Sequence, residues 1–486
     1  MAMLLTFLIA LPLLAACFIA LLEAKHRRII EWAVMVTGGV ELVLALALVP
    51  AVLTDGRVEA SALFSLDALG AFVSLLIALV GCFASVYSVG YLRAESAKEI
   101  VGPSRVRQYF LLLKLFFFAM FLAVATMSPV VMWIAIEATT LSTAFLISFY
   151  NKQSATEAAW KYLILNSLGL LLSLLGTLLF LALPELREGS LTWSGLRACA
   201  STMAPLIVQI VSVFVLVGDG TQIGFVPLHS WKPDTYSKAP TPIAALLSSV
   251  LLNVAFLAVL RFKGLTDTAI GSGFSSELLM LFGTLSIAVA ALLIFVQKNY
   301  KRLLAYSSIE HAGLMALGFG FGGVGTLAAL LHMLYHSLGK ALVFFVAGNA
   351  FLKYGTTKMH QVTGMLRSLP VSGPIFFVVL LALLGLPPFG LFTTKFLMLS
   401  AGMETAPYVV GGVLVALSVI FFGFLRHAHA MLFGATPENV TVGEQNALTV
   451  WPVALLLCLF FVLSWYLPTP LSELVEMAVT SLSLTR

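Results

Sequence analysis

Apolar stretches recur along the whole chain and are separated by short polar spacers. Each is roughly 20 residues long, enough for a helix to cross about 30 Å of hydrocarbon, and so predicts one membrane span. The pattern predicts fourteen spans, at residues 3–22, 29–54, 66–90, 109–127, 129–150, 158–183, 205–229, 240–262, 276–297, 303–320, 325–352, 371–403, 407–430 and 447–467. No spacer is long enough for a soluble domain, so we expect one all-α, polytopic membrane domain over residues 1–486.

Two of the predicted spans are interrupted. The sequence PPFG at 387–390 divides residues 371–403, which are too long for one crossing, and three glycines and a proline crowd the end of residues 205–229. Proline removes a backbone donor and glycine relaxes the chain, so we expect broken helices at spans 7 and 12.

The two breaks lie five spans apart, and this spacing predicts an internal repeat. Broken helices at corresponding places in two halves are typical of transporters built from inverted repeats. We therefore expect two inverted five-helix repeats at 109–262 and 276–434, preceded by three helices in 1–108 and followed by a C-terminal helix and tail in 435–486.

The composition supports a membrane protein. Of the 486 residues, 60% are hydrophobic and 10% are charged, whereas soluble proteins carry about a quarter charged residues. The four cysteines lie far apart, so we expect neither a disulfide nor a metal site. The first five residues carry no Lys or Arg, unlike the start of a signal peptide, and we interpret residues 3–22 as the first span.

Basic residues are distributed unevenly over the predicted loops. Loops after odd-numbered spans hold 18 Lys and Arg, Lys232 among them, and loops after even-numbered spans hold five. By the positive-inside rule the odd-numbered loops are cytoplasmic and both chain ends lie outside. We expect a multi-pass protein of the bacterial inner (cytoplasmic) membrane, and the net charge of +5 reflects topology rather than nucleic-acid binding.

Three lysines and one glutamate stand out inside predicted spans: Lys114, Lys340, Lys395 and Glu137. A charged side chain at the bilayer centre costs at least ~2.5–3.5 kcal/mol on insertion scales, so those that are kept usually face a polar interior. Lys114 lies nearer the start of its helix, and we expect its amine to extend to the membrane interface.

Glu137 and Lys395 are candidate proton carriers. Glu137 lies in the middle of its span, where it is either a proton-exchanging acid or a neutral carboxyl bonded to a neighbouring helix. Lys395 follows the 387–390 break, where water and backbone carbonyls can reach it. It is either a proton carrier or an amine that extends to an interface.

His332, His336 and Lys340 stand at i, i+4 and i+8, on one face of the span at 325–352. Three titratable groups on one face favour a hydrogen-bonded proton wire, since imidazole changes charge near physiological pH. A metal site is less favoured because no cysteine or acidic ligand is nearby. His311 either belongs to this relay or lies at its mouth.

Motifs for soluble catalysis and redox cofactors are absent from the sequence. We find no phosphate-binding glycine loop, no GxSxG, no cysteine cluster for iron–sulfur and no haem-type histidine pair. We therefore expect no cofactor, and any electron transfer would take place in another subunit.

Five stretches together resemble the proton-conducting membrane transporter family, the antiporter-like subunits of complex I, Mrp antiporters and energy-converting hydrogenases. They are WIAIEATTLSTAF at 133–145, GTQIGFVPLHSWKPDTYSKAPTP at 220–242, QKNYKRLLAYSSIEHAG at 297–313, HMLYHSLGKALVFF at 332–345 and PPFGLFTTKF at 387–396. The set is specific, and it looks most like the hydrogenase-4 component F branch.

The resemblance implies fourteen core helices with a central polar axis. In such families a glutamate on span 5 pairs with a lysine on span 7, and a charged residue on span 12 gates the exit. Glu137 matches the span 5 glutamate, and Lys395 matches the charged residue on span 12. At the lysine positions of spans 7 and 8 this chain has Gln222 and Asn253, which hold water but cannot carry the proton. Asp219, one turn before Gln222, is a candidate replacement acid.

The preferred hypothesis is a proton-translocating subunit of a hydrogenase-4-like or complex I-like oxidoreductase. Its partners would be other membrane subunits and, indirectly, peripheral iron–sulfur subunits. One alternative is a proton-channel partner of a non-redox enzyme, such as an inorganic-carbon uptake system. The other is a subunit of a Na⁺/H⁺ antiporter.

Overall fold

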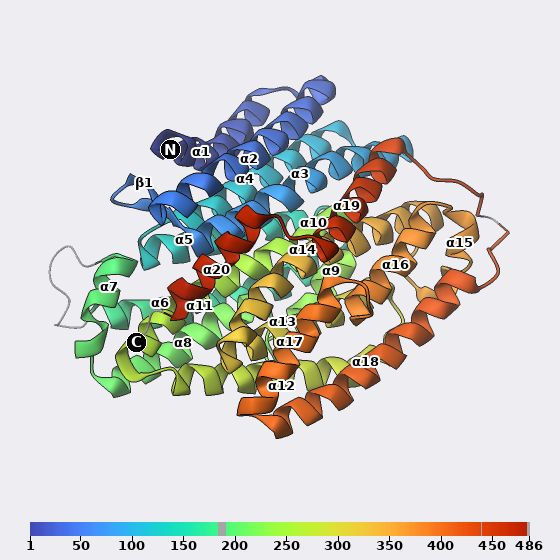
Figure 1. Ribbon diagram of the computed structural model, residues 1–486. Helices are drawn as coiled ribbons and strands as arrows, with labels where there is room; N and C mark the ends of the chain where they lie inside the picture. Colours follow the sequence, from blue (N-terminus) through green and yellow to red (C-terminus); the bar gives the residue numbers. More distant parts are fainter. Residues whose placement is uncertain (183–190, 439, 484–486) are drawn as a thin grey trace.

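The computed structural model describes residues 1–182, 191–438 and 440–483, and most of them lie in helices packed side by side (Figure 1). Within these residues, twelve helices are long and apolar enough to cross a membrane. They are α1 (Ala2–Leu21), α2 (Arg27–Asp55), α3 (Ala68–Ala97), α4 (Pro103–Ala125), α5 (Pro129–Ile147), α6 (Gln153–Leu181), α8 (Pro205–Ile223), the continuous α10–η3–α11 helix (Thr241–Ile270), α12 (Gly273–Ile294), α14 (Val324–Tyr354), α18 (Pro407–Phe433) and α19 (Ala447–Trp465).

Two more predicted spans are helical but differ from these twelve. Helix α13 (Tyr300–Phe321) carries Glu310 and His311 and is therefore less apolar. The span predicted at 371–403 is divided into α16 (Ser372–Leu384) and α17 (Gly390–Thr405). With these, all fourteen predicted spans are accounted for, and the predicted all-α polytopic fold is confirmed.

Both predicted breaks are present, and each begins at a glycine. Helix α8 ends before Gly224, whose φ is +80°, and α16 ends before Gly385, whose φ is +81°. This left-handed conformation suits glycine because it has no Cβ. After the first break the chain continues as the short helix α9 (Trp231–Lys238), and after the second as α17.

Two helices form the centre of the bundle. In the 18-residue apolar segment of each helix, 100% of the α10–η3–α11 helix and 94% of α14 is buried inside the protein, whereas only 28% of α18 is buried. Figure 1 shows α14 in the middle, where it packs against α3, α10, α13, α16, α17 and α19. Large apolar side chains such as Leu171, Leu292 and Val415 are exposed on outer helices. The outer surface is therefore suited to contact with lipid, and the polar groups of α14 lie in the interior of the protein.

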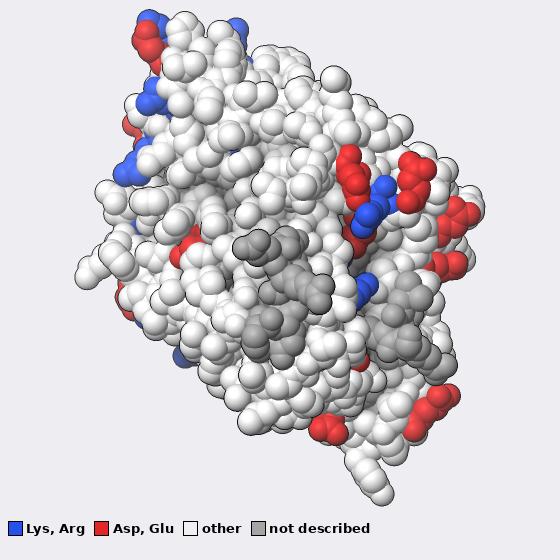
Figure 2. Space-filling view, turned by 90° about the vertical axis from the view of Figure 1, so that its left-hand side faces the viewer, with Lys and Arg blue, Asp and Glu red and all other residues white. Residues whose placement is uncertain are grey.

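On one face of the molecule, charged side chains gather toward two opposite sides. On the face seen in Figure 2, most visible acidic and basic side chains lie near the left and right edges, and uncharged surface extends between them. This arrangement is expected for a protein whose loops are hydrated and whose middle faces hydrocarbon.

Several short elements were not predicted. A two-stranded antiparallel hairpin, β1 (Arg57–Ser61) and β2 (Phe64–Asp67), connects α2 and α3. Beyond α19, the C-terminal tail forms α20 (Thr469–Ser483), which packs against α2, α3, α11 and α14. The connections also contain short helices: η1 (Ala24–His26), α7 (Trp193–Cys199), η2 (Ala200–Thr202), η4 (Met359–Gln361) and α15 (Met365–Ser368).

Helix α20 lies beside three loops that follow even-numbered spans. It borders cavities that are also lined by Gly56, Asp267 and Gly322, which follow predicted spans 2, 8 and 10. Three even-numbered loops therefore lie on the same side of the bundle, as alternating spans require.

Candidate functional site

An ion pair lies at the second break. Lys395 on α17 directs its Nζ to Oε1 of Glu310 on α13, at 2.9 Å. The same amine donates to the carbonyl oxygens of Leu383 and Leu384, at 3.1 and 3.5 Å. These carbonyls belong to the last turn of α16, where a helix has no internal donors left. Because both side chains are buried, Lys395 does not extend to an interface.

Three histidines lie next to this ion pair. Nδ1 of His311 is 2.8 Å from Nε2 of His332, and Nδ1 of His332 is 2.8 Å from Oγ1 of Thr394, the neighbour of Lys395. The rings of His311 and His336 have centroids 5.0 Å apart. All three histidines are fully buried. The structure therefore places His311 with the predicted face of α14 and not at a solvent-facing mouth.

Lys340 and Asn253 continue the same interior line. The Lys340 amine donates to the carbonyl of Leu304 on α13, at 3.1 Å. Nδ2 of Asn253 donates to Oγ of Ser337, one residue after His336, at 2.7 Å. Asn253 follows the π-helical segment η3 (Leu247–Leu251). Such segments are frequent at functional sites because they offset the helical register.

The first half of the chain has no ion pair at the predicted positions. Oε1 of Glu137 on α5 accepts from Oγ of Ser167 on α6, at 2.7 Å. Asp219 on α8 accepts from Oγ of Ser173 on the same helix α6, at 2.8 Å. Gln222 is buried, and neither atom of its amide has a hydrogen-bond partner among the described residues. The two acids are therefore each bound to a serine hydroxyl of α6.

Lys232 is buried in a helix, and its placement in a loop was wrong. It lies on α9, directly after the first break, and only 1% of its surface is exposed. Its Nζ has no hydrogen-bond partner in the part of the chain that the structure describes and lies 5.9 Å from the ring centroid of Trp231. A lysine shortly after a Gly–Pro break is also what marked Lys395, so the sequence carried a usable signal.

Lys114 also differs from expectation. Its side chain is fully buried, and its Nζ lies 2.7 Å from Oε1 of Glu41 on α2. The amine does not extend to the interface, because a carboxylate from a neighbouring helix compensates its charge. Glu41 was not singled out in the sequence.

A further buried carboxyl, Glu95, lies at the end of α3. Its Oε1 accepts from the hydroxyl of Tyr150 at 2.6 Å, and Tyr150 bonds Tyr91 at 3.0 Å. Lys301, close enough to Glu95 for an electrostatic interaction, is itself buried and donates to the carbonyl of Ala239 at 2.7 Å. Glu95, Lys301 and Glu310 were all missed as buried charges.

Several of the buried polar atoms that have no hydrogen-bond partner belong to residues of the interior line. Within the described residues they include Glu137 Oε2, Gln222 Oε1 and Nε2, Lys232 Nζ, Asn253 Oδ1, His311 Nε2 and both ring nitrogens of His336. Proteins leave few buried polar atoms unpaired, and ordered water is the usual partner of the rest. We call the line from Glu137 through Gln222, Lys232, Asn253 and the three histidines to Lys395 the central axis.

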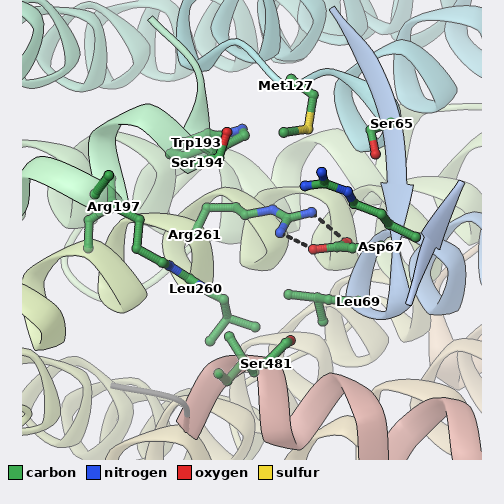
Figure 3. Close-up of a pocket in the computed structure, with 14 residues that line it drawn as sticks. Ser65, Asp67, Leu69, Met127, Trp193, Ser194, Arg197, Leu260, Arg261 and Ser481 are labelled. Atoms are coloured by element: carbon green, nitrogen blue, oxygen red, sulfur yellow. Dashed lines mark hydrogen bonds and ion pairs between the residues drawn. The ribbon is translucent and has the colours of Figure 1, made fainter. Parts of the chain in front are cut away.

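Figure 3 shows a different polar site, which lies away from the central axis. It is a cavity of about 410 Å³, and Asp67 and Arg261 form an ion pair at its wall. Arg261 Nη2 donates to Asp67 Oδ1 at 2.7 Å, and Asp67 also caps the start of α3. This pair ties the β1–β2 hairpin to α11, and none of the predicted site residues lines the cavity.

The described residues offer no metal centre: no group of three or more His, Cys, Asp and Glu side chains is arranged to hold an ion. The histidines face one another, a threonine and lysines. These side chains can exchange protons between neighbouring nitrogen and oxygen atoms.

Comparisons with known proteins agree with this geometry. A hydrogenase-4 component F homolog from Methylacidiphilum infernorum is 37% identical over 359 residues, covering 73% of this chain and 75% of the relative. An NADH-quinone oxidoreductase subunit N from Desulforudis audaxviator is 30% identical over 376 residues, covering 75% and 72%. A chain of the archaeal membrane-bound sulfane sulfur reductase superposes with a TM-score of 0.86 at 25% identity, over 98% of this chain and 97% of that chain.

The family model described as "NADH:quinone oxidoreductase/Mrp antiporter, TM" matches residues 126–421. The matched segment is more than half of the chain and includes the central axis from Glu137 to Lys395. The predicted resemblance is thereby confirmed: the chain belongs to the NADH:quinone oxidoreductase/Mrp antiporter transmembrane family.

Proposed function

We propose that this chain translocates protons across the bacterial inner membrane as one subunit of a larger redox complex. The observation that carries the proposal is the central axis, in which titratable side chains and two amides lie in the interior of the bundle. Retaining so many of them costs insertion energy, and such groups in membrane proteins usually serve ion or proton pathways.

In the second half of the axis the proton would move between directly bonded groups. His332 lies between His311 and Thr394, and an imidazole can accept a proton on one nitrogen while releasing one from the other. Lys395 would hold or release the last proton, with Glu310 stabilising the ammonium form.

In the first half, water is proposed to carry the proton where side chains cannot. Gln222 and Asn253 have unpaired polar atoms but no titratable group. A water chain bonded to these atoms would connect Glu137 with the histidines. Asp219, held by Ser173, is a second acid beside this path.

The two halves are proposed to be the predicted inverted repeats, at 109–262 and 276–434. Their breaks share a left-handed glycine followed by a proline three residues later, at Gly224 and Pro227 and at Gly385 and Pro388. We also propose the predicted orientation, with the odd-numbered loops in the cytoplasm and both chain ends outside, because the basic residues gather in those loops.

The proposed partners are other membrane subunits and, through them, an iron–sulfur redox unit. The relatives named above are a hydrogenase-type component and an NADH-quinone oxidoreductase subunit, and the sulfane sulfur reductase is a respiratory membrane complex. These relatives do not favour the inorganic-carbon uptake system or the separate Na⁺/H⁺ antiporter.

The test is to purify the native complex through a tag on this chain and to identify its subunits by mass spectrometry. The redox subunits define the electron donor, and proton movement is then followed with a pH dye after reconstitution in liposomes. We expect donor-dependent proton movement that an uncoupler abolishes. A complex without redox subunits, or turnover without proton movement, overturns the proposal.

A further inference from the structure

The two helix breaks share a feature beyond their backbone. At each one, a lysine from the following half-helix lies across the left-handed glycine. A Cβ added to Gly224 would lie 2.6 Å from Cδ of Lys232, and a Cβ added to Gly385 would lie 2.8 Å from Cδ of Lys395. The glycines thus leave room for the two alkyl chains, and the two lysines occupy equivalent places.

The acids beside these lysines are related in the same way. Lys395, on span 12, pairs with Glu310 on span 10. Five spans earlier, the half-helix α9 that follows the break of span 7 carries Lys232, and span 5 carries Glu137. Glu137 therefore corresponds to Glu310, but its Oε2 is buried without a hydrogen-bond partner among the described residues.

Lys232 is linked to the histidines directly and to Glu137 through two aromatic rings. On one side, Glu137 interacts electrostatically with the phenol of Tyr162, whose ring packs 5.0 Å from that of Trp231, the residue before Lys232. On the other side, Lys232 interacts electrostatically with His336 and Lys340 on α14. The amine of Lys232 therefore faces bases on α14, and Glu137 on α5 is connected to its helix through Tyr162 and Trp231.

We propose that Lys232 is the proton carrier of the first half of the central axis and replaces a lysine at Gln222. This inference rests on the proposed function. A proton leaves Nζ of Lys232 and is taken up through water by a ring nitrogen of His336, which leaves a neutral amine and an imidazolium. The carboxyl of Glu137 then gives its proton to the amine through water, so that a carboxylate and an ammonium remain and the net charge is unchanged.

The proposal makes opposite predictions for stability and for transport. An amine buried without a hydrogen-bond partner is unfavourable, so Lys232→Met should leave the melting temperature of the purified complex unchanged or raise it. Proton movement per turnover of the reconstituted complex should fall by about 10²-fold or more, the usual contribution of a proton-transfer group. Lys238→Gln is the matched control, because Lys238 is an exposed lysine on the same helix.

A second variant separates proton exchange from mere charge. Lys232→Arg keeps a positive charge but cannot release its proton, and it should be as impaired as Lys232→Met. Normal transport in Lys232→Arg overturns the inference. A melting temperature of Lys232→Met so low that unfolding explains its lost transport overturns it too. This inference fails and the proposed function stands if the wild-type complex and Lys232→Met both move protons and Lys395→Met moves none. If wild type moves none, the proposed function itself fails.

Discussion

The buried ion pair between Lys395 and Glu310 allows a quantitative prediction. Lys395→Met leaves Glu310 buried without its cation, and removing one partner of such a pair costs about 3–5 kcal/mol of folding free energy. Two carbonyls of α16, from Leu383 and Leu384, also lose their donor. Glu310→Gln should cost less, because the lysine keeps these two carbonyls as acceptors. We therefore expect Lys395→Met near the upper end of this range and Glu310→Gln near the lower end.

The double variant Lys395→Met/Glu310→Gln tests whether the two residues act as a pair. With no buried charge left, it should be more stable than the sum of the single changes predicts, by about 1–3 kcal/mol of coupling energy. The measurement is equilibrium unfolding of the purified chain in mixed detergent micelles. Lys298→Met, at an exposed lysine between α12 and α13, is the control and should change little. Strictly additive effects would refute the geometry of the pair.

Three further predictions concern other residues. Glu137→Gln should assemble normally but reduce proton movement by about 10²-fold or more, and a normal rate would show that Glu137 is only a neutral acid hydrogen-bonded to Ser167. Lys114→Met should destabilise the chain by about 3–5 kcal/mol, while the added change Glu41→Gln should restore much of this loss and transport per assembled complex should stay normal. Single cysteines at Arg105 and Lys358 should react with a membrane-impermeant reagent from the cytoplasmic side, and labelling from the opposite side would mean that the orientation is reversed.

The spans could be predicted because the bilayer imposes their length and composition. Even α13 was found, although Glu310 and His311 make it less apolar. The breaks were found because proline and glycine act on the local backbone. The β1–β2 hairpin and α20 were not found, since they are too short or too polar to cross a membrane and gain their stability from packing on α2 and α3.

The site residues were predicted less completely than the fold. A charge inside an apolar span is visible in the sequence, and this is how Glu137, Lys340 and Lys395 were found. Their partners are not visible in the same way. Glu310 pairs with a residue 85 positions later, and Glu41 with one 73 positions later. Such pairs depend on which helices pack together, which a single sequence does not specify.

Lys232 shows where counting apolar residues stops being informative. Hydropathy detects segments that face lipid, and Lys395 was placed inside a span because apolar residues follow it. Polar residues follow Lys232, so α9 resembled a loop. In the structure α9 packs against α6, α10 and α13, and a polar half-helix is stable there because protein groups surround it and lipid does not.

The difference in basic residues between odd-numbered and even-numbered loops remains when the buried lysines are left out. Without the buried Lys232 and Lys301, the odd-numbered loops still hold 16 of the original 18 basic residues against five. The topology is therefore set by many exposed charges, whereas the chemistry of the axis depends on the few that lie inside.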